Sequence, residues 1–206
     1  MKIRAVLPTV ALAAVLFLPR AGAAPVEAPL PESISGACDV SFLVSSTLHD
    51  FPGSGRCVPF TATVTRDAEG RRILPIVEVE VPVDGMDTRN RSRDAQMREM
   101  FQADRFPRIH ASVRDVDVDR LREAMGKDPG GKAPLDLLLR IRDVERKVRA
   151  TAGSLKETGE RVSFALEFPV SLKEFGLKPP SVLGIIRVGD KVSVKATFDL
   201  TVSRSP

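Results

Sequence analysis

The sequence predicts an all-β protein, an antiparallel β-barrel of about eight strands with one covering α-helix. Apolar residues alternate with polar residues along many short segments, the segments are separated by short turns, and one segment has a clear helical period instead. Amphipathic antiparallel strands leave exposed edges unless the sheet closes on itself or splits into a sandwich. A closed barrel of this size holds either packed side chains or one small apolar ligand.

Residues 1–23 have the features of a secretory signal peptide: a basic start at Lys2, an apolar run over residues 5–18, and small residues before a cleavage site after Ala23. The apolar run is shorter than the roughly 20 residues that a spanning helix needs, and it contains Pro8. We therefore expect no transmembrane segment in the mature chain, and a periplasmic or secreted location.

The charge of the mature chain is close to balanced. Cleavage removes three basic residues and no acidic one, so 28 of the 31 Lys and Arg residues remain against 27 Asp and Glu. With no basic stripe interleaved with aromatic residues, we expect no nucleic-acid partner. Residues 24–36, rich in Pro and without periodicity, are predicted as an extended leader, and residues 37–206 as one barrel domain.

Two cysteines, Cys38 and Cys57, flank the segment STLHDFPGSG. In an oxidising compartment they can form one disulfide that closes this loop. The alternative is two buried free thiols, and the spacing alone does not decide between them.

The strands are predicted from period-two alternation, in which the apolar residues face one side of the sheet. The last two are the clearest, and residues 142–147 are predicted as the polar bend of a hairpin. The inward residues are, in chain order, Val40, Phe42 and Val44; Val58, Phe60, Ala62 and Val64; Val77, Val79, Val81 and Val83; Ile109, Ala111 and Val113; Leu135, Leu137, Leu139 and Ile141; Val148, Ala150 and Ala152; Val162, Phe164, Leu166, Phe168, Val170 and Leu172; Val192, Val194, Ala196, Phe198, Leu200 and Val202.

Residues 92–103 break the alternation. Met97, Met100 and Phe101 stand at the i, i+3 and i+4 spacing among charged residues, which predicts an amphipathic helix capped by Ser92. The apolar stripe of this helix is either plain core against the barrel or a gate over a ligand.

Two further segments lie outside the strand pattern. A short helix is predicted over residues 120–125, with Gly126 as its C-terminal stop. Residues 175–186 are apolar, punctuated by Gly and Pro, and lie between two strong strands. This loop is a lid on the barrel, a surface for a partner or membrane, or a segment that packs on its own barrel.

The inventory for catalysis is small: two histidines, and no GxSxG, HExxH, CxxC or glycine-rich phosphate loop. His49 with Asp50 can supply a base and its orienting acid, but the favoured interpretation is a bend that Asp50 begins and residues 52–55 complete. His110 alternates with apolar neighbours and is predicted to face solvent. We therefore expect no enzyme activity, no catalytic residue, no metal site and no resident cofactor.

The chain resembles the YceI-like family of exported, lipocalin-like barrels associated with binding polyisoprenoid lipids. The resemblance rests on FLVSSTLHDFPGSG followed by VPF, on VEVEVPVDGMDTRNRSRDAQMREMFQADRFPRI, on LRIRDVERKV and on the closing FPVSLKEFGLKPPSVLGIIRVGDKVSVKATFDL. These stretches cover nearly all of the chain from Cys38 onward. The run DVDVDRLREAMGKDPGGKA departs from the family as an insertion, Asp143 stands where the family often has Gly, and Trp and Tyr are absent.

The resemblance implies a barrel whose interior holds a long apolar chain, such as an isoprenoid or quinone tail. The buried positions that match the family are then the candidate ligand-lining residues, although each of them is also compatible with packed core. They are Phe42, Val44, Phe60, Val79, Met97, Met100, Phe101, Phe164, Phe168 and Phe198.

Three functions compete at this point. The first is a non-enzymatic periplasmic carrier or sequestering protein for an isoprenoid or other long-chain amphiphilic lipid. The second is a stress-related periplasmic interaction protein with a packed barrel and residues 175–186 as its partner-binding loop. The third is an enzyme that uses His49 and Asp50. A homodimer remains open in each case.

Overall fold

A computed structural model describes residues 32–47, 49–179, 181–182 and 186–204. The predicted signal peptide and the first part of the predicted leader lie outside these residues. The described strands are β1 (Glu32–Ser46), β2 (Phe51–Arg56), β3 (Phe60–Arg66), β4 (Arg72–Pro82), β5 (Arg108–Asp117), β6 (Ala133–Ile141), β7 (Val144–Thr158), β8 (Arg161–Ser171), β9 (Ser181–Val182) and β10 (Ile186–Arg204). The helices are α1 (Arg91–Phe101) and α2 (Val118–Lys127), with short 3-10 turns η1 (Val83–Gly85) and η2 (Lys173–Phe175).

Eight of the described strands close into an antiparallel barrel, as the sequence predicts. The ring runs β1, β3, β4, β5, β6, β7, β8, β10 and returns to β1. The closing ladder between β1 and β10 extends from Glu32 opposite Arg204 to Val44 opposite Val192, and its register then shifts before Ser46. Because β10 also pairs with β8, every strand of the ring has a neighbour on both sides.

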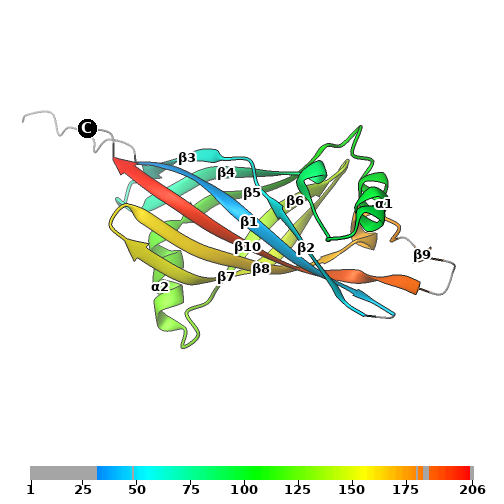
Figure 1. The fold of residues 1–206 in the computed structure, drawn as a ribbon. Coiled ribbons are helices and arrows are strands. Elements are labelled where there is room, and N and C mark those ends of the chain that lie inside the picture. Colours follow the sequence, from blue (N-terminus) through cyan, green and yellow to red (C-terminus); the bar gives the residue numbers. More distant parts are fainter. Residues whose placement is uncertain (1–31, 48, 180, 183–185, 205–206) are drawn as a thin grey trace, which may run out of the picture.

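The helices lie at opposite ends of the barrel (Figure 1). α1 lies beside the end of β1, where its Arg93 guanidinium stands 4.5 Å from the ring of Phe51. α2 lies beside the start of β4, where Asp119 accepts hydrogen bonds from Arg72. We call these two places the α1 end and the α2 end. Among the described residues, neither helix reaches the length and apolar character that a membrane crossing requires.

β1 is longer than the alternation predicted, because it begins at Glu32, within the segment predicted as a leader. Its length lets two short strands pair with it in succession on the same side. β3 pairs with its first part, and β2 pairs with the part from Asp39 to Val44.

The prediction that residues 52–55 complete a turn is wrong, because they belong to β2. Of the described residues between β1 and β2, Thr47 forms a bend, and His49 and Asp50 have no regular secondary structure. Gly53 lies directly opposite Phe42, and a Cβ on Gly53 would lie 2.1 Å from the Phe42 ring. The ring occupies the space that a side chain on β2 would need, so this glycine serves close packing inside a strand.

Both helices begin earlier than predicted, since asparagine and aspartate side chains cap them. Asn90, not Ser92, caps α1 by accepting hydrogen bonds from the backbone N–H groups of Ser92 and Arg93. Asp117 caps α2 in the same way, and α2 continues past Gly126 to Lys127. The prediction of Gly126 as the helix stop is therefore wrong.

The β6–β7 hairpin is tighter than predicted. Ile141 pairs with Val144, so the turn contains only two residues, and Arg142 adopts a positive φ of 57°. Further along β7 the register shifts between Gly153 and Lys156. This irregularity moves the inward positions from even to odd numbers, and Leu155 faces the interior after Ala152.

The start of the predicted loop over residues 175–186 packs on the barrel. Phe175 and Leu177 are 1% and 2% exposed and belong to the same apolar cluster as Phe42 and Met97. These two residues do not form a surface for a partner. Residues 180 and 183–185 lie outside the described residues.

Gly53→Ala is expected to destabilise the fold, because the new methyl group overlaps the buried Phe42 ring. Overpacking of this kind costs about 1–3 kcal/mol. Urea unfolding followed by circular dichroism measures the change, and Phe42→Leu in the same chain should recover part of it. Gly126→Ala is the matched control, since nothing lies within 4 Å of its Cβ position and alanine favours the helix. Equal stability of Gly53→Ala and the parent protein would contradict the close packing.

Candidate ligand-binding cavity

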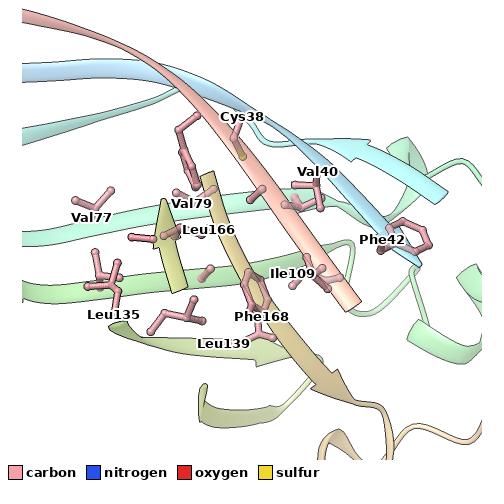
Figure 2. Close-up of a pocket in the computed structure, with 18 of the residues that line it drawn as sticks. Cys38, Val40, Phe42, Val77, Val79, Ile109, Leu135, Leu139, Leu166 and Phe168 are labelled. Carbon is pink, nitrogen blue, oxygen red and sulfur yellow. The ribbon is translucent and has the colours of Figure 1, made fainter. Parts of the chain in front are cut away.

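The barrel encloses a cavity of about 540 Å³, in the size range of small-molecule and cofactor sites. Side chains from β1, β4, β5, β6 and β8 converge on it, among them Cys38, Val79, Ile109, Leu139 and Phe168 (Figure 2). The lining is overwhelmingly apolar because each strand directs its alternate residues inward.

The cavity is long and narrow. Along β1 its apolar lining residues run from Ile34 to Val44, ten residue steps, which corresponds to about 33 Å along the strand at roughly 3.3 Å per residue. A modest volume spread over this length matches one extended chain better than a compact ring system.

All ten candidate residues from the sequence line this cavity. They are Phe42, Val44, Phe60, Val79, Met97, Met100, Phe101, Phe164, Phe168 and Phe198. Phe164 and Phe198 stack with ring centroids 4.8 Å apart, and Phe60 meets Phe198 edge-on at 6.2 Å. The aromatic residues therefore form part of the wall and are packed against one another as well as facing the interior.

A disulfide between Cys38 and Cys57 lies in the cavity wall. It joins β1 to the short connection between β2 and β3, and the backbone N–H of Cys57 also donates to the Cys38 carbonyl at 3.0 Å. Both cysteines are nearly fully buried. The disulfide therefore fastens the β2–β3 connection to the point at which β1 changes its pairing partner from β3 to β2.

At the α1 end the polar side chains of Thr88, Arg93 and Gln96 join the apolar lining residues. Asp94 is buried and accepts hydrogen bonds from the backbone N–H and the hydroxyl of Thr88, at 2.9 and 2.6 Å. Burial alone would raise the pKa of Asp94, but these hydrogen bonds and the nearby Arg98 and Arg93 outweigh it and hold the pKa below its usual value. Arg93 in turn donates to the Thr88 carbonyl at 2.7 Å and covers the ring of Phe51.

At the α2 end the lining contains charged residues that are paired, among apolar neighbours such as Leu74 and Val116. Arg72 donates from Nε to Asp119 at 2.9 Å, and Arg122 lies 2.5 Å from Glu157. The hydrogen bonds from Arg72 lower the pKa of Asp119, and Asp119 raises that of Arg72. Within each of these two pairs the opposite charges offset each other.

The two histidines lie in different parts of the barrel. His49 is exposed and lines the α1 end of the cavity, and its backbone N–H and carbonyl both hydrogen-bond with the Ser46 hydroxyl. His110 lies on the outer face of β5, as predicted, with Nδ1 3.3 Å from Glu80. Among the described residues, no group of three or more His, Cys, Asp or Glu side chains is arranged to hold a metal ion.

Sequence reasoning missed the contribution of α2 to the cavity. Val118, Leu121 and Met125 line it, and Met125 is buried. Their i, i+3, i+7 spacing is that of a helix with one apolar face, and this signal was available in the sequence. Because the predicted helix covered only residues 120–125, it was too short for the whole face to be recognised.

The YceI-like domain family matches residues 37–200 of the chain. No curated protein sequence matches it significantly. Similar solved structures include Burkholderia cenocepacia BcnA, at 14% identity and a TM-score of 0.56 over 79% of this chain and 95% of that one. A polyisoprenoid binding domain from Saccharophagus degradans, implicated in plant cell wall breakdown, matches at 13% identity and a TM-score of 0.52 over 84% and 99%. At sequence identities of 13–14%, these similarities show a shared fold only.

The ion pair between Asp119 and Arg72 is expected to make part of the stability pH-dependent. The pKa of Asp119 is lower in the folded chain than the ordinary value of about 3.9, so its stabilisation is present above that value and is lost as the pH falls through the folded pKa. The melting temperature of Asp119→Asn should therefore lie below that of the parent protein at neutral pH, and the two should converge below about pH 4.

Thermal unfolding across this pH range, followed by circular dichroism, measures the difference. Arg72→Gln should reproduce it, and the double variant should lose no more than either single variant, because both remove one interaction. A difference that persists unchanged in acid would contradict the assignment to the Asp119 carboxylate.

Proposed function

The chain belongs to the YceI-like domain family, and from this premise we propose that it is a non-enzymatic carrier or sequestering protein for a lipid. The lipid is an isoprenoid or another long-chain amphiphile, and its apolar chain occupies the barrel interior. The observation that carries this proposal is the long, narrow, apolar cavity.

Burial of apolar surface supplies the binding energy in this proposal. Each 100 Å² of chain surface removed from water contributes about 2.5 kcal/mol before the costs of association. A lipid tail needs no polar contact to be retained, whereas a polar ligand would leave its hydrogen-bonding groups unpaired against valine, leucine and phenylalanine. The walls therefore favour a hydrocarbon chain over sugars, nucleotides or peptides.

The comparison with known folds supports the isoprenoid class. The domain from Saccharophagus degradans that shares this fold is described as polyisoprenoid binding. Carried over to this chain, that property fits a cavity with the length of an extended prenyl chain. The ten lining residues named above, from Phe42 to Phe198, are then the proposed ligand contacts.

We place the protein in the periplasm. The signal peptide predicted over residues 1–23 supports export, and a disulfide between Cys38 and Cys57 is typical of an oxidising compartment. The packed-barrel alternative has less support, because the interior contains a cavity and the residues Phe175 and Leu177 of its partner-binding loop are buried.

Phe164→Asp is expected to abolish lipid retention, because it places a carboxylate beside the stacked Phe198 ring in the apolar wall. Native mass spectrometry of protein purified from the periplasm should show a lipid adduct for the parent protein, with an isoprenoid fragmentation pattern after organic extraction. For the variant the adduct should fall by at least about a hundredfold, the loss expected when the burial of one phenylalanine is replaced by a charge.

Thr197→Asp is the matched control, since it adds the same charge to an exposed, outward-facing position next to Phe198 on β10. It should retain the lipid fully. Circular dichroism establishes that both variants are folded. Lipid that stays bound to folded Phe164→Asp would show that the interior of the barrel is not the binding site, and a parent protein without any adduct would count against the carrier function.

A further inference from the structure

α2 closes a gap in the barrel wall. β5 and β6 pair only where residues 110–112 meet residues 138–140, and α2 follows β5 directly. Beyond this short ladder the two strands are not joined toward the α2 end. α2 contacts β4, β5 and β6 there, and it takes the place of the missing ladder (Figure 1).

Two ion pairs hold α2 across this gap. Asp119 pairs with Arg72 at the start of β4, and Arg122 pairs with Glu157 near the end of β7. β4 and β7 are the strands that flank β5 and β6 in the ring. The helix is therefore fastened on both sides of the opening that it covers.

The inner face of α2 is apolar and reaches the cavity. Leu121 and Met125 lie one turn apart on this face, and both line the cavity. Met125 is only 6% exposed and belongs to the same buried cluster as Val79, Leu166 and Phe198. Its side chain thus occupies space that would otherwise extend the cavity at this end.

The polar groups that line the cavity differ between its two ends. The lining at the α2 end includes the paired side chains of Arg72 and Arg122 among apolar residues such as Leu74, and displacing an ion pair would cost an apolar chain free energy. At the α1 end, by contrast, the side chains of Gln96 and His49 line the cavity without a side-chain hydrogen bond to any described residue. The polar head of an amphiphile finds hydrogen-bonding groups at the α1 end, and its tail points toward α2.

We propose that α2 limits the length of the chain that the barrel accepts, with Met125 and Leu121 as the side chains against which the tail ends. This inference rests on the proposed lipid-carrier function and adds a determinant of chain length to it. The helix (Val118–Lys127) lies in the segment that the sequence analysis predicts to be an insertion relative to the family, and on that prediction the length limit belongs to this chain's own residues.

Met125→Ala tests the proposal. The delipidated protein is mixed with an equimolar series of all-trans prenols that differ by single isoprene units, and native mass spectrometry counts the bound species. The parent protein should prefer one length. In Met125→Ala the ratio of the next longer prenol to the preferred one should rise about tenfold, as expected when roughly two more methylene-sized groups are buried.

Met97→Ala is the matched control, because Met97 is 9% exposed, lines the same cavity from α1 and loses the same atoms on truncation. It should weaken binding of all prenols and leave the preferred length unchanged. Met125→Leu nearly conserves volume and should keep the parent preference. Leu121→Ala provides a second test of the same face if Met125→Ala does not fold, as judged by circular dichroism.

The outcomes separate the two proposals. A parent protein that selects a prenol length, together with folded Met125→Ala and Leu121→Ala variants that keep that length, would overturn the role of α2 and leave the carrier function intact. An equal shift in Met97→Ala would also overturn it, because the limit would then not lie at α2. Failure of the parent protein to bind any prenol would instead refute the proposed function.

Discussion

The antiparallel ladder between β1 and β10 is the constraint on which the rest of the molecule depends. It joins the first strand to the last and converts an open sheet into a ring, so that neither of the two long strands presents an edge. Closure of the ring also determines where the apolar residues of the alternating pattern lie. Once the ring is closed, every inward residue faces one shared interior, and the apolar faces of strands far apart in sequence become the wall of a single cavity.

The same alternation explains what could be predicted from the sequence. Phe164, Leu166 and Phe168 on β8 face inward as their spacing predicts, and so do the corresponding residues of β10. Every second residue of a strand must be buried, so the inward positions can be predicted from that strand alone, without knowing which strand pairs with it. The strand residues among the candidate lining positions agree with this pattern, whereas their role in lining a ligand site was implied by the family resemblance, because alternation alone is compatible with both a hollow and a packed interior.

The features that the sequence did not reveal are those set by contacts between distant segments. Gly53 looks like a turn residue, yet its place opposite Phe42 depends on β1 being long enough to pair with two strands in succession. The irregularity in β7 near Ser154, which has a positive φ, shifts the inward positions and leaves no clear signature in composition. The cap of α1 was assigned to the wrong residue for a simpler reason, since Asn90 and Ser92 have about equal capping preferences and residue type alone does not choose between them.

A hollow interior carries a cost, because side chains that line a cavity lose the dispersion contacts that a packed core provides. Three features of the structure oppose that cost without filling the interior: the ladder that closes the ring, the disulfide that joins β1 to the β2–β3 connection, and the cap that α2 forms through its ion pairs on both sides of the β5–β6 gap. All three act in the wall and leave the apolar space available. A chain that enters this space supplies the missing contacts, and since it binds only the folded barrel it also stabilises it. The contacts that close the barrel therefore lie in its wall, and they leave the interior accessible to the ligand proposed above.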